Sequence, residues 1–536
     1  MKFRKTIFNF CRGAISCFAR QYLILAILLI AAFLRLYKIS DYMTFLGDEG
    51  RDALVVYNIL HGKLTLLGPT ASVGGFFMGP IYYYFMTPFL WLFNYNPAGP
   101  AVMVALFGIA TVWLVYKVGK EFFGTKAGVI SALIYAVSPV VIAYSRSSWN
   151  PNLMPFFSLL TVYMLYKAVL KNNFKFFILT GILYGIAIQL HYIELFLGAA
   201  IVFYILFIRV FVRSHLAKGA TLMQVLFRII KDYFFISVGF IIGFSPFLAF
   251  ELRHGFPNTR SIINFIFSSK DTGVNEKFLD VLGNVFFRLF GRLITRFLPL
   301  EQIDISKNLD ISIWYYLTLL LAFVSVLIFA IKFLKDIKEK KNVQKYIILI
   351  VWFVIVLFLY GFYKKAIYDY YLELLFPLPF LFVGLFLSTL LEKGIILKIV
   401  SISIITALFI WNIDGMPFKF PPNKQMEQVR NISEFVLSKT DNKPFNFALV
   451  TAGNSDHGYR YFMKLAKKDP IIIENFDNDP KRLTVKDQLL VICEDPNCKP
   501  LGHSLWEIAG FGRAEIDGKW DINFVRVYKL VHYKGK

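Results

Sequence analysis

The sequence predicts an all-α polytopic membrane core followed by a small C-terminal α/β domain outside the membrane, and three observations support this fold class. First, the 536-residue chain is 57% hydrophobic and 18% aromatic, with a mean hydropathy of +0.57, which is unlike a soluble globular protein. Second, apolar stretches near the length of a bilayer span recur up to about residue 412. Third, polar and turn-rich sequence prevails from residue 413 onward. We therefore predict a transmembrane domain over 1–412 and a soluble domain over 413–536.

The apolar stretches predict about eleven transmembrane helices. They cover 20–38, 98–117, 127–145, 152–170, 176–191, 193–211, 233–250, 311–332, 345–363, 370–390 and 395–412. The first stretch follows a basic N-terminal segment, but it is long and lacks a small-x-small cleavage site. We interpret it as an uncleaved span rather than a signal peptide.

The basic residues set the orientation. The formal net charge is +23, and Lys and Arg cluster before the first span and in KVGKEFFGTK, LKNNFK, RVFVRSHLAKGATLMQVLFRIIKD and KFLKDIKEKKNVQK. With eleven spans these segments share one side, which the positive-inside rule assigns to the cytoplasm. The charge thus needs no nucleic-acid partner. We predict a plasma-membrane protein with a cytoplasmic N-terminus, an extracytoplasmic soluble domain and membrane lipids as neighbours.

The first outer loop, 39–97, is too long to be a simple connection. Its sequence DEGRDALVVYNILHG has apolar residues at helical spacing, an acidic first turn and Gly62 as a C-terminal stop. This pattern predicts an amphipathic helix on the outer membrane surface. The next apolar stretch contains Pro80 and Pro88, and a full span there would reverse the side of every later loop. We interpret it as a second interfacial or re-entrant element.

The soluble domain combines strand and helix patterns. The predicted strands are FNFALVTA, PIIIENF, QLLVICE and INFVRVYKLVHY, and the predicted helices are QMEQVRNISEFVLSK and HGYRYFMKLAKK. The domain has no phosphate-binding glycine motif and no ligand spacing typical of a metal site. Cys493 and Cys498 either form a disulfide or remain free thiols, and both alternatives stay open.

Ionisable residues gather on the predicted outer face, at the ends of the spans. A carboxylate beside Arg and Lys at the edge of the apolar region suits glycosyl transfer: the carboxylate deprotonates a hydroxyl or amine that attacks an anomeric carbon, and the cations stabilise the departing phosphate. Nucleotide sugars are normally cytoplasmic. A donor used outside would therefore be a sugar on a polyprenyl phosphate, whose tail stays in the membrane.

Several segments resemble glycosyltransferase family 39, whose members include protein O-mannosyltransferases and bacterial lipid A aminoarabinose transferases with the C-type glycosyltransferase fold. The segments are DEGRDALVVYNILHGK with GPIYYYFMTPFLWLF, then KVGKEFFGTKAGVISALIYAVSPVVIAYSRSSWNPNLMPFFSLL, GIAIQLHYIELFLGAA and YDYYLELLFPLPFLFVGL. The resemblance covers residues 20–390. It implies an inverting enzyme that moves a monosaccharide from a polyprenyl-phosphate donor to a protein, lipid or glycan acceptor.

The resemblance also implies site residues. It assigns Asp48 as the catalytic base and Glu49 as the second member of the family's acidic pair. The candidates for binding the donor phosphate or substrate are Arg51, Arg146, His191, Lys364, Lys365 and Tyr371. Where many relatives carry an acid, SRSSWNPN has Asn150 and Asn152. This departure weakens the case for a second carboxylate or a metal ion, so we predict no cofactor; a divalent metal is compatible with the sequence but not supported by it.

The same residues also have structural interpretations. Asp48 and Glu49 would cap a helix, and Asp52 would be a solvated neighbour four residues beyond Asp48. His191 would be a hydrogen-bonded residue between two spans. The Arg and Lys side chains would extend to lipid headgroups.

Two other classes of function remain alternatives. A transporter or flippase for a lipid-linked or polar substrate typically has paired repeats and ionisable residues near the bilayer midplane; here the charges lie mainly at span ends, and no repeat is visible. A receptor or scaffold acting through the soluble domain would leave the acidic pair of the first loop unexplained.

Overall fold

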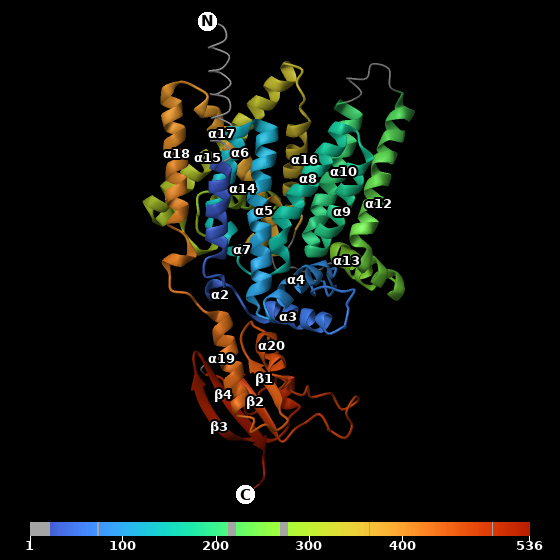
Figure 1. The fold of residues 1–536 in the computed structure, drawn as a ribbon, viewed down its shortest axis with the longest axis vertical. Coiled ribbons are helices and arrows are strands. Elements are labelled where there is room, and N and C mark those ends of the chain that lie inside the picture. Colours follow the sequence, from blue (N-terminus) through green and yellow to red (C-terminus); the bar gives the residue numbers. More distant parts are fainter. Residues whose placement is uncertain are drawn as a thin grey trace.

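The computed structural model describes residues 22–71, 74–212, 221–268, 277–363, 365–495 and 497–535. A helical bundle forms one end of the molecule, and a four-stranded sheet with its own helices forms the other (Figure 1). Helices of the first outer loop lie between the two parts (Figure 1). They are α2 (Ile39–Tyr42), α3 (Gly47–Leu60) and α4 (Ile81–Leu92).

Six helices within the described ranges are long and apolar enough to cross a membrane. They are α5 (Ala98–Phe123), η1 (Asn150–Leu153) with α8 (Met154–Lys171), η2 (Tyr192–Glu194) with α10 (Leu195–Phe207) and the π-helical η3 (Ile208–Val212), α12 (Leu222–His254), α15 (Leu309–Lys338) and α18 (Ile395–Ile413). A seventh candidate is the pair η6 (Asp369–Leu375) and α17 (Pro377–Leu391), which is bent by 58°.

Shorter apolar helices complete the bundle. They are Tyr22–Leu36, α6 (Thr125–Val137), α9 (Phe174–Leu190) and α16 (Gln344–Tyr360). A break at Ser138 separates α6 from α7 (Pro139–Tyr144). The multi-pass architecture predicted from the sequence is confirmed, and each predicted span has an apolar helix at its position. The number of eleven crossings stays a prediction.

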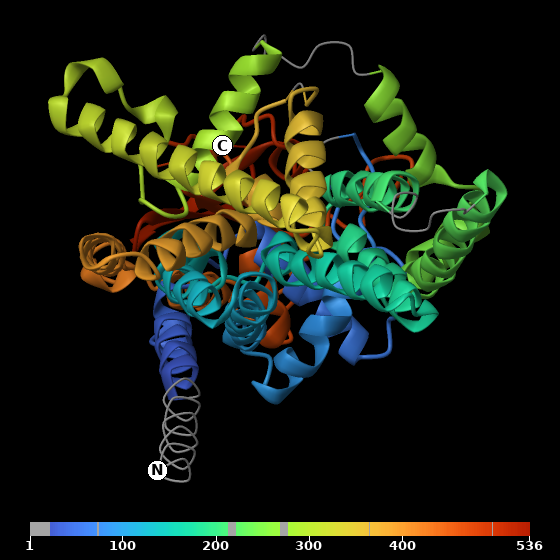
Figure 2. The same ribbon diagram turned by 90° about the horizontal axis from the view of Figure 1, so that it is seen from above.

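Glycines allow α9 and α12 to pack at close range. A Cβ atom at Gly181 would lie 2.0 Å from the carbonyl oxygen of Ile236, and one at Gly243 would lie 2.2 Å from that of Ile182. Such close backbone approach is typical of membrane helices, where apolar side chains gain little by leaving lipid. In two perpendicular views, α12 and α18 lie on opposite sides of the bundle (Figures 1 and 2).

The long connection after α12 contains α13 (Pro257–Ser268) and α14 (Phe278–Gly291), followed by the short turns η4 (Leu300–Gln302) and η5 (Ile305–Lys307). One face of α14 is buried against the bundle through Val281, Val285 and Leu289. The same helix carries the buried Arg288, so the connection brings a cation against the bundle.

The segment 39–97 is buried on two sides. A single apolar cluster joins Val56 of α3, Tyr82 of α4 and Val104 of α5 to Phe462 of the C-terminal part. The helix predicted at DEGRDALVVYNILHG is present as α3, but it is enclosed by α4 and by α20 (His457–Leu465). The predicted helix is thus present, and in addition the C-terminal part packs on it; its place on the membrane surface stays a prediction.

The C-terminal part has a mixed sheet in the order β1-β2-β4-β3. Its strands are β1 (Asn446–Val450), β2 (Gln488–Cys493), β3 (Ala514–Ile522) and β4 (Val525–His532). β1 and β2 are parallel, and the other pairs are antiparallel. Its helices are α19 (Gln425–Ser438), α20 and α21 (Trp506–Ala509), and η7 (Pro417–Lys419) precedes them. A disulfide joins Cys493 to Cys498.

The strand predictions for this part were correct at β1, β2 and β4 and wrong twice. PIIIENF is extended but belongs to no strand. The N–H of Ile471 donates a hydrogen bond to the carbonyl oxygen of Phe445, and the carbonyl oxygen of Ile471 accepts one from the Asn446 side chain. The edge strand β3 was missed because AEIDGKWDI contains Asp and Gly, which are rare in strands. β3 forms because it pairs along one side with β4.

We predict that Gly50→Ala loosens the attachment of the C-terminal part. A Cβ atom at Gly50 would lie 2.3 Å from the backbone nitrogen of Gly458 on α20, so one backbone must move, at a cost of about 1–3 kcal/mol. Thermal unfolding of the full chain in detergent measures the effect. Gly283→Ala is the matched control, because that helical glycine is exposed and has no atom near its Cβ position. Equal unfolding temperatures for the two variants would contradict the close contact.

Candidate active site

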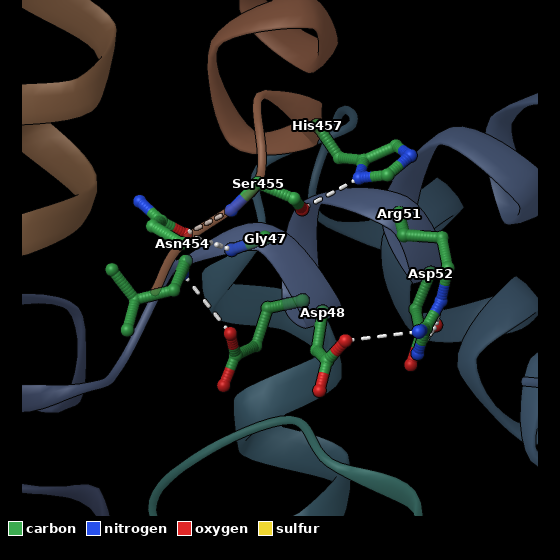
Figure 3. Close-up of polar contacts among 9 residues, drawn as sticks. Gly47, Asp48, Arg51, Asp52, Asn454, Ser455 and His457 are labelled. Atoms are coloured by element: carbon green, nitrogen blue, oxygen red, sulfur yellow. Dashed lines mark hydrogen bonds and ion pairs between the residues drawn. The ribbon is translucent and has the colours of Figure 1, made fainter. Parts of the chain in front are cut away.

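Asp48 lies at the start of α3, beside a cavity of about 660 Å³ between the bundle and the C-terminal part. Its carboxylate is 54% exposed and accepts a hydrogen bond of 2.9 Å from Nη1 of Arg51, one helical turn away (Figure 3). The aromatic residues Tyr144 and Trp149 line the cavity from the bundle. Asp48 is thus accessible to a bound molecule.

Arg51 links two carboxylates. Its Nη2 atom lies 2.8 Å from Oδ1 of Asp52, while Nη1 contacts Asp48. Asp52 is completely buried, and burial raises its pKa to about 6 even though Arg51 opposes the shift. The interpretation of Asp52 as a solvated neighbour was wrong, because α4 and the bundle cover that face of α3. Arg51, named as a substrate-binding candidate, is held beside Asp48 by this pair.

Glu49 is buried, although it borders the same cavity. Its Oε2 accepts a hydrogen bond of 3.0 Å from the backbone N–H of Leu46, so it caps the first turn of α3. Burial raises its pKa to about 7. Of the acidic pair, Asp48 is therefore the member whose carboxylate is open to a substrate, and Glu49 holds the turn that carries it.

A loop of the C-terminal part forms the opposite wall of the cavity through Gly453, Asn454 and Ser455. Oδ1 of Asn454 accepts a hydrogen bond of 2.9 Å from the backbone N–H of Gly47, and Ser455 contacts Nδ1 of His457 at 2.7 Å (Figure 3). The sequence analysis did not find this wall. No local signal marks it, because Asn454 is 407 residues from the helix it contacts.

A second cavity, of about 410 Å³, lies between α14 and the segment that leads into η6. Arg288, Lys365, Tyr368 and Asp369 line it. Arg288 donates two hydrogen bonds, of 2.6 and 3.0 Å, to Oδ1 of Asp369, and Arg292 donates one of 2.9 Å to Oδ2. Two arginines thus share one carboxylate, and the cluster has an excess of positive charge.

The sequence analysis named Lys365 but missed Arg288 and Arg292. Their spacing of four residues in the apolar segment FFRLFGRLITR was an available signal, because it places both cations on one face of a helix.

Aromatic residues connect the two cavities. The rings of Trp149, in the first cavity, and Tyr370 are 4.5 Å apart, and Tyr370 stacks on Tyr368 of the second cavity at 5.7 Å. Two ring contacts therefore link a wall of the cavity beside Asp48 to a wall of the cavity lined by Arg288.

His191 and Tyr371 lie behind these residues. His191 is buried, stacks on Tyr192 at 4.5 Å, and its Nδ1 accepts a hydrogen bond from the backbone N–H of Ile193. Tyr371 is buried too, and the hydroxyl of Tyr192 donates to its hydroxyl at 3.2 Å. Neither His191 nor Tyr371 lines either of the two cavities. Their contacts support the structural interpretation that the sequence left open for His191.

Arg146 has a structural role in this fold. It is buried, and its guanidinium donates to the carbonyl oxygens of Leu34 and Tyr37 at 2.9 and 2.7 Å, where the first helix ends. Its planar group also lies 4.9 Å from the ring centre of Phe418. These contacts use both terminal nitrogens of Arg146 and favour a structural role over the predicted binding of a lipid phosphate. Lys364 lies outside the described residues.

The two asparagines of SRSSWNPN also donate hydrogen bonds to backbone carbonyl oxygens. Asn150 donates to the carbonyl oxygen of Leu190, and Asn152 donates to that of Ser147. Within the part of the chain that the structure describes, no three His, Cys, Asp or Glu residues are grouped to hold a metal ion.

Comparison with known proteins places this site in a wider context. A family model described as dolichyl-phosphate-mannose-protein mannosyltransferase matches residues 78–231. Two proteins of Bacillus subtilis with provisional names as mannosyltransferases are similar: YycA is 27% identical over 141 residues, and YkcB is 24% identical over 149 residues. These matches cover 26% and 27% of this chain and 21% of each relative. The chain therefore spans about a fifth of the length of the curated relatives it matches.

Solved structures share the fold. ArnT from Cupriavidus metallidurans bound to undecaprenyl phosphate has a TM-score of 0.59 at 11% identity, covering 95% of this chain and 97% of ArnT. The oligosaccharyltransferase AglB from Archaeoglobus fulgidus, in complex with an inhibitory peptide and dolichol-phosphate, has a TM-score of 0.54 at 12% identity, covering 89% and 69%. These findings confirm the predicted resemblance to glycosyltransferase family 39 and the C-type glycosyltransferase fold.

We predict that Glu49→Gln makes stability less dependent on pH. The folded protein holds the Glu49 proton up to a pKa of about 7, whereas the unfolded chain releases it near its usual pKa of about 4.5. The folded state therefore loses stability as the pH rises between these values. Glutamine still accepts from Leu46 but does not ionise, so the variant should avoid a loss on the order of 3 kcal/mol.

Thermal unfolding in detergent from about pH 5 to about pH 8 measures this difference. The control is Glu427→Gln, which removes an exposed carboxylate on α19. If Glu49→Gln and Glu427→Gln follow the same pH profile, the Glu49 carboxyl is not desolvated in solution.

Proposed function

We propose that this protein is an inverting membrane glycosyltransferase that moves a monosaccharide from a polyprenyl phosphate to a hydroxyl or amine acceptor on the extracytoplasmic face. The observation that carries the proposal is the accessible carboxylate of Asp48 in one cavity, whose wall is linked through the rings of Trp149, Tyr370 and Tyr368 to a second, cation-lined cavity. The C-type fold and the mannosyltransferase family model support the same class of reaction. Both similar structures hold a polyprenyl phosphate or dolichol-phosphate.

Asp48 is the proposed general base. It takes the proton from the acceptor while the acceptor atom attacks the anomeric carbon, and the bond from that carbon to the phosphate oxygen breaks. One displacement inverts the anomeric configuration. Arg51 lies 2.9 Å from the Asp48 carboxylate and holds it beside the cavity.

The arginine cluster is the proposed site for the donor phosphate. Arg288 and Lys365 face the second cavity, and Asp369 offsets only part of their charge. A phosphate there would gain negative charge as the sugar leaves, and nearby guanidinium groups stabilise that charge. A phosphate in the second cavity would be separated from the cavity of Asp48 by the rings of Tyr370 and Trp149, and the sugar would have to extend past them to reach Asp48.

The sidedness of the protein is part of the proposal. Eleven crossings with a cytoplasmic N-terminus would put α3, both cavities and residues 413–536 on the outer face of the plasma membrane. The donor lipid would then present its headgroup where the cavities open. A protein, lipid or glycan would serve as acceptor.

We expect Asp48→Asn to abolish turnover without preventing donor binding. The amide keeps the shape of the carboxylate but cannot accept the proton, which should lower release of sugar from lipid by at least about 100-fold. Purified protein in nanodiscs with radiolabelled polyprenyl-phosphate sugars, with and without candidate acceptors, provides the measurement. Asp280→Asn is the control, because Asp280 is exposed on α14.

Two outcomes would count against the assignment. Equal turnover of Asp48→Asn and wild type would remove Asp48 from the mechanism. Wild-type binding of donor lipids without release to any acceptor would instead favour a lipid transporter or flippase.

Arg288→Gln should weaken binding of the donor rather than the proton transfer. Loss of one charge-assisted contact predicts a rise of about 10- to 100-fold in the KM for the lipid donor. The Kd for polyprenol, which lacks the phosphate, should change less. The comparison uses polyprenyl phosphate and the corresponding polyprenol in a binding assay. Arg253→Gln, at an exposed position at the end of α12, is the control. If both variants bind the phosphate like wild type, the second cavity is not the phosphate site.

A further inference from the structure

We propose that the C-terminal part belongs to the catalytic site, with Asn454 as a positioning residue for Asp48 and Glu494 as the group that orients Asn454. The inference rests on the proposed function in assigning Asp48 as the base. It goes further by giving a role to a domain in which the sequence shows no chemistry of its own.

Asn454 completes the N-terminus of α3 from outside the helix. The first N–H groups of a helix have no partner within it. Oδ1 of Asn454 accepts from the N–H of Gly47 at 2.9 Å and from the N–H of Ser455 at 2.8 Å. Gly47 directly precedes Asp48 in the first turn of α3. The residue that caps this turn in space thus comes from the other end of the chain.

Glu494 fixes which way the Asn454 amide points. Nδ2 of Asn454 donates to Oε1 of Glu494 at 3.0 Å, and Tyr459 and Thr451 donate to the same carboxylate at 2.9 and 2.6 Å. A carboxylate accepts hydrogen bonds only, so the NH₂ group of Asn454 must face Glu494. Its carbonyl oxygen is then directed toward Gly47.

The position of Glu494 is itself fixed. It follows directly on β2, next to Cys493, whose disulfide with Cys498 closes the turn. The N–H of Glu494 also donates to the carbonyl oxygen of Val450 at the end of β1. The hydrogen-bonded chain therefore runs from the central strands of the sheet through Glu494 and Asn454 to the turn that bears Asp48.

The contact is too close to be incidental. A Cβ atom at Gly47 would lie 2.0 Å from Oγ of Ser455, so the loop and the helix turn meet at backbone distance. On its other side, Asp48 is held by Arg51 at 2.9 Å. Displacement of a catalytic group by about 1 Å can lower the rate about 100-fold, so a shift of this turn would affect catalysis before it affected donor binding in the second cavity.

A charge swap tests the proposal. Asn454→Asp places two carboxylates against each other, and we expect kcat to fall about 10- to 100-fold while the KM for the lipid donor changes less than about twofold. In the double variant Asn454→Asp with Glu494→Gln, the new glutamine amide donates to the new aspartate, which still accepts from Gly47. We expect the double variant to recover kcat to within about fivefold of wild type.

The control variant is Asn475→Asp, the same change at an exposed position of the C-terminal part. Hydrogen exchange of the peptide containing Leu46 to Gly50, measured by mass spectrometry on the full chain, gives a readout independent of turnover. Exchange should rise in Asn454→Asp and return to the wild-type rate in the double variant, in parallel with kcat.

Each other outcome overturns the proposal. Unchanged exchange in Asn454→Asp would show that the residue does not hold α3, and increased exchange with unchanged kcat would show that holding α3 does not position the base. Failure of the double variant to recover would mean that the Asn454–Glu494 pair is not the coupling. If wild type releases no sugar from any donor, the proposed function fails, while the exchange data still decide whether Asn454 holds the helix.

Discussion

The fold depends on the enclosure of α3 between the membrane bundle and the C-terminal part. This helix is fourteen residues long and has buried positions around much of its circumference, including Glu49 and Asp52. Two buried carboxylates are costly unless they are protonated or paired. Here Arg51 pairs with Asp52, and Glu49 caps the turn, so the polar groups that specify the site are also those that the packing must satisfy.

The enclosure explains why two parts of different character form one molecule. Apolar side chains of α3, α4 and α5 share a cluster with residues of α19, α20 and the sheet. The interface is therefore a hydrophobic core rather than a polar contact between independent domains, and it keeps the cavity walls in register. A cavity whose two walls come from opposite ends of the chain requires such a rigid junction.

The electrostatic arrangement follows a similar logic. The accessible acid lies on one side of Trp149 and Tyr370, and the arginine cluster lies on the other. Direct pairing of Asp48 with Arg288 would neutralise both groups. Asp369 instead pairs with Arg288 and Arg292 and offsets their mutual repulsion. Asp48 pairs with Arg51. In glycosyl transfer, this separation would leave room for a sugar between base and phosphate.

The sequence by itself determined the membrane character, the positions of the apolar helices, the helix at the acidic pair and three of the four strands. These features depend on hydropathy and periodicity, which are sums over neighbouring residues. It also indicated Asp48, because acids beside a span are unusual. Only the tertiary structure decided that Arg146 clamps the end of the first helix, that Asp52 is buried and that Asn454 caps α3. The reason is that burial and capping depend on segments that meet only in the folded chain: the partners of Arg146 and Asn454 lie 112 and 407 residues away, and the burial of Asp52 depends on the elements packed over α3.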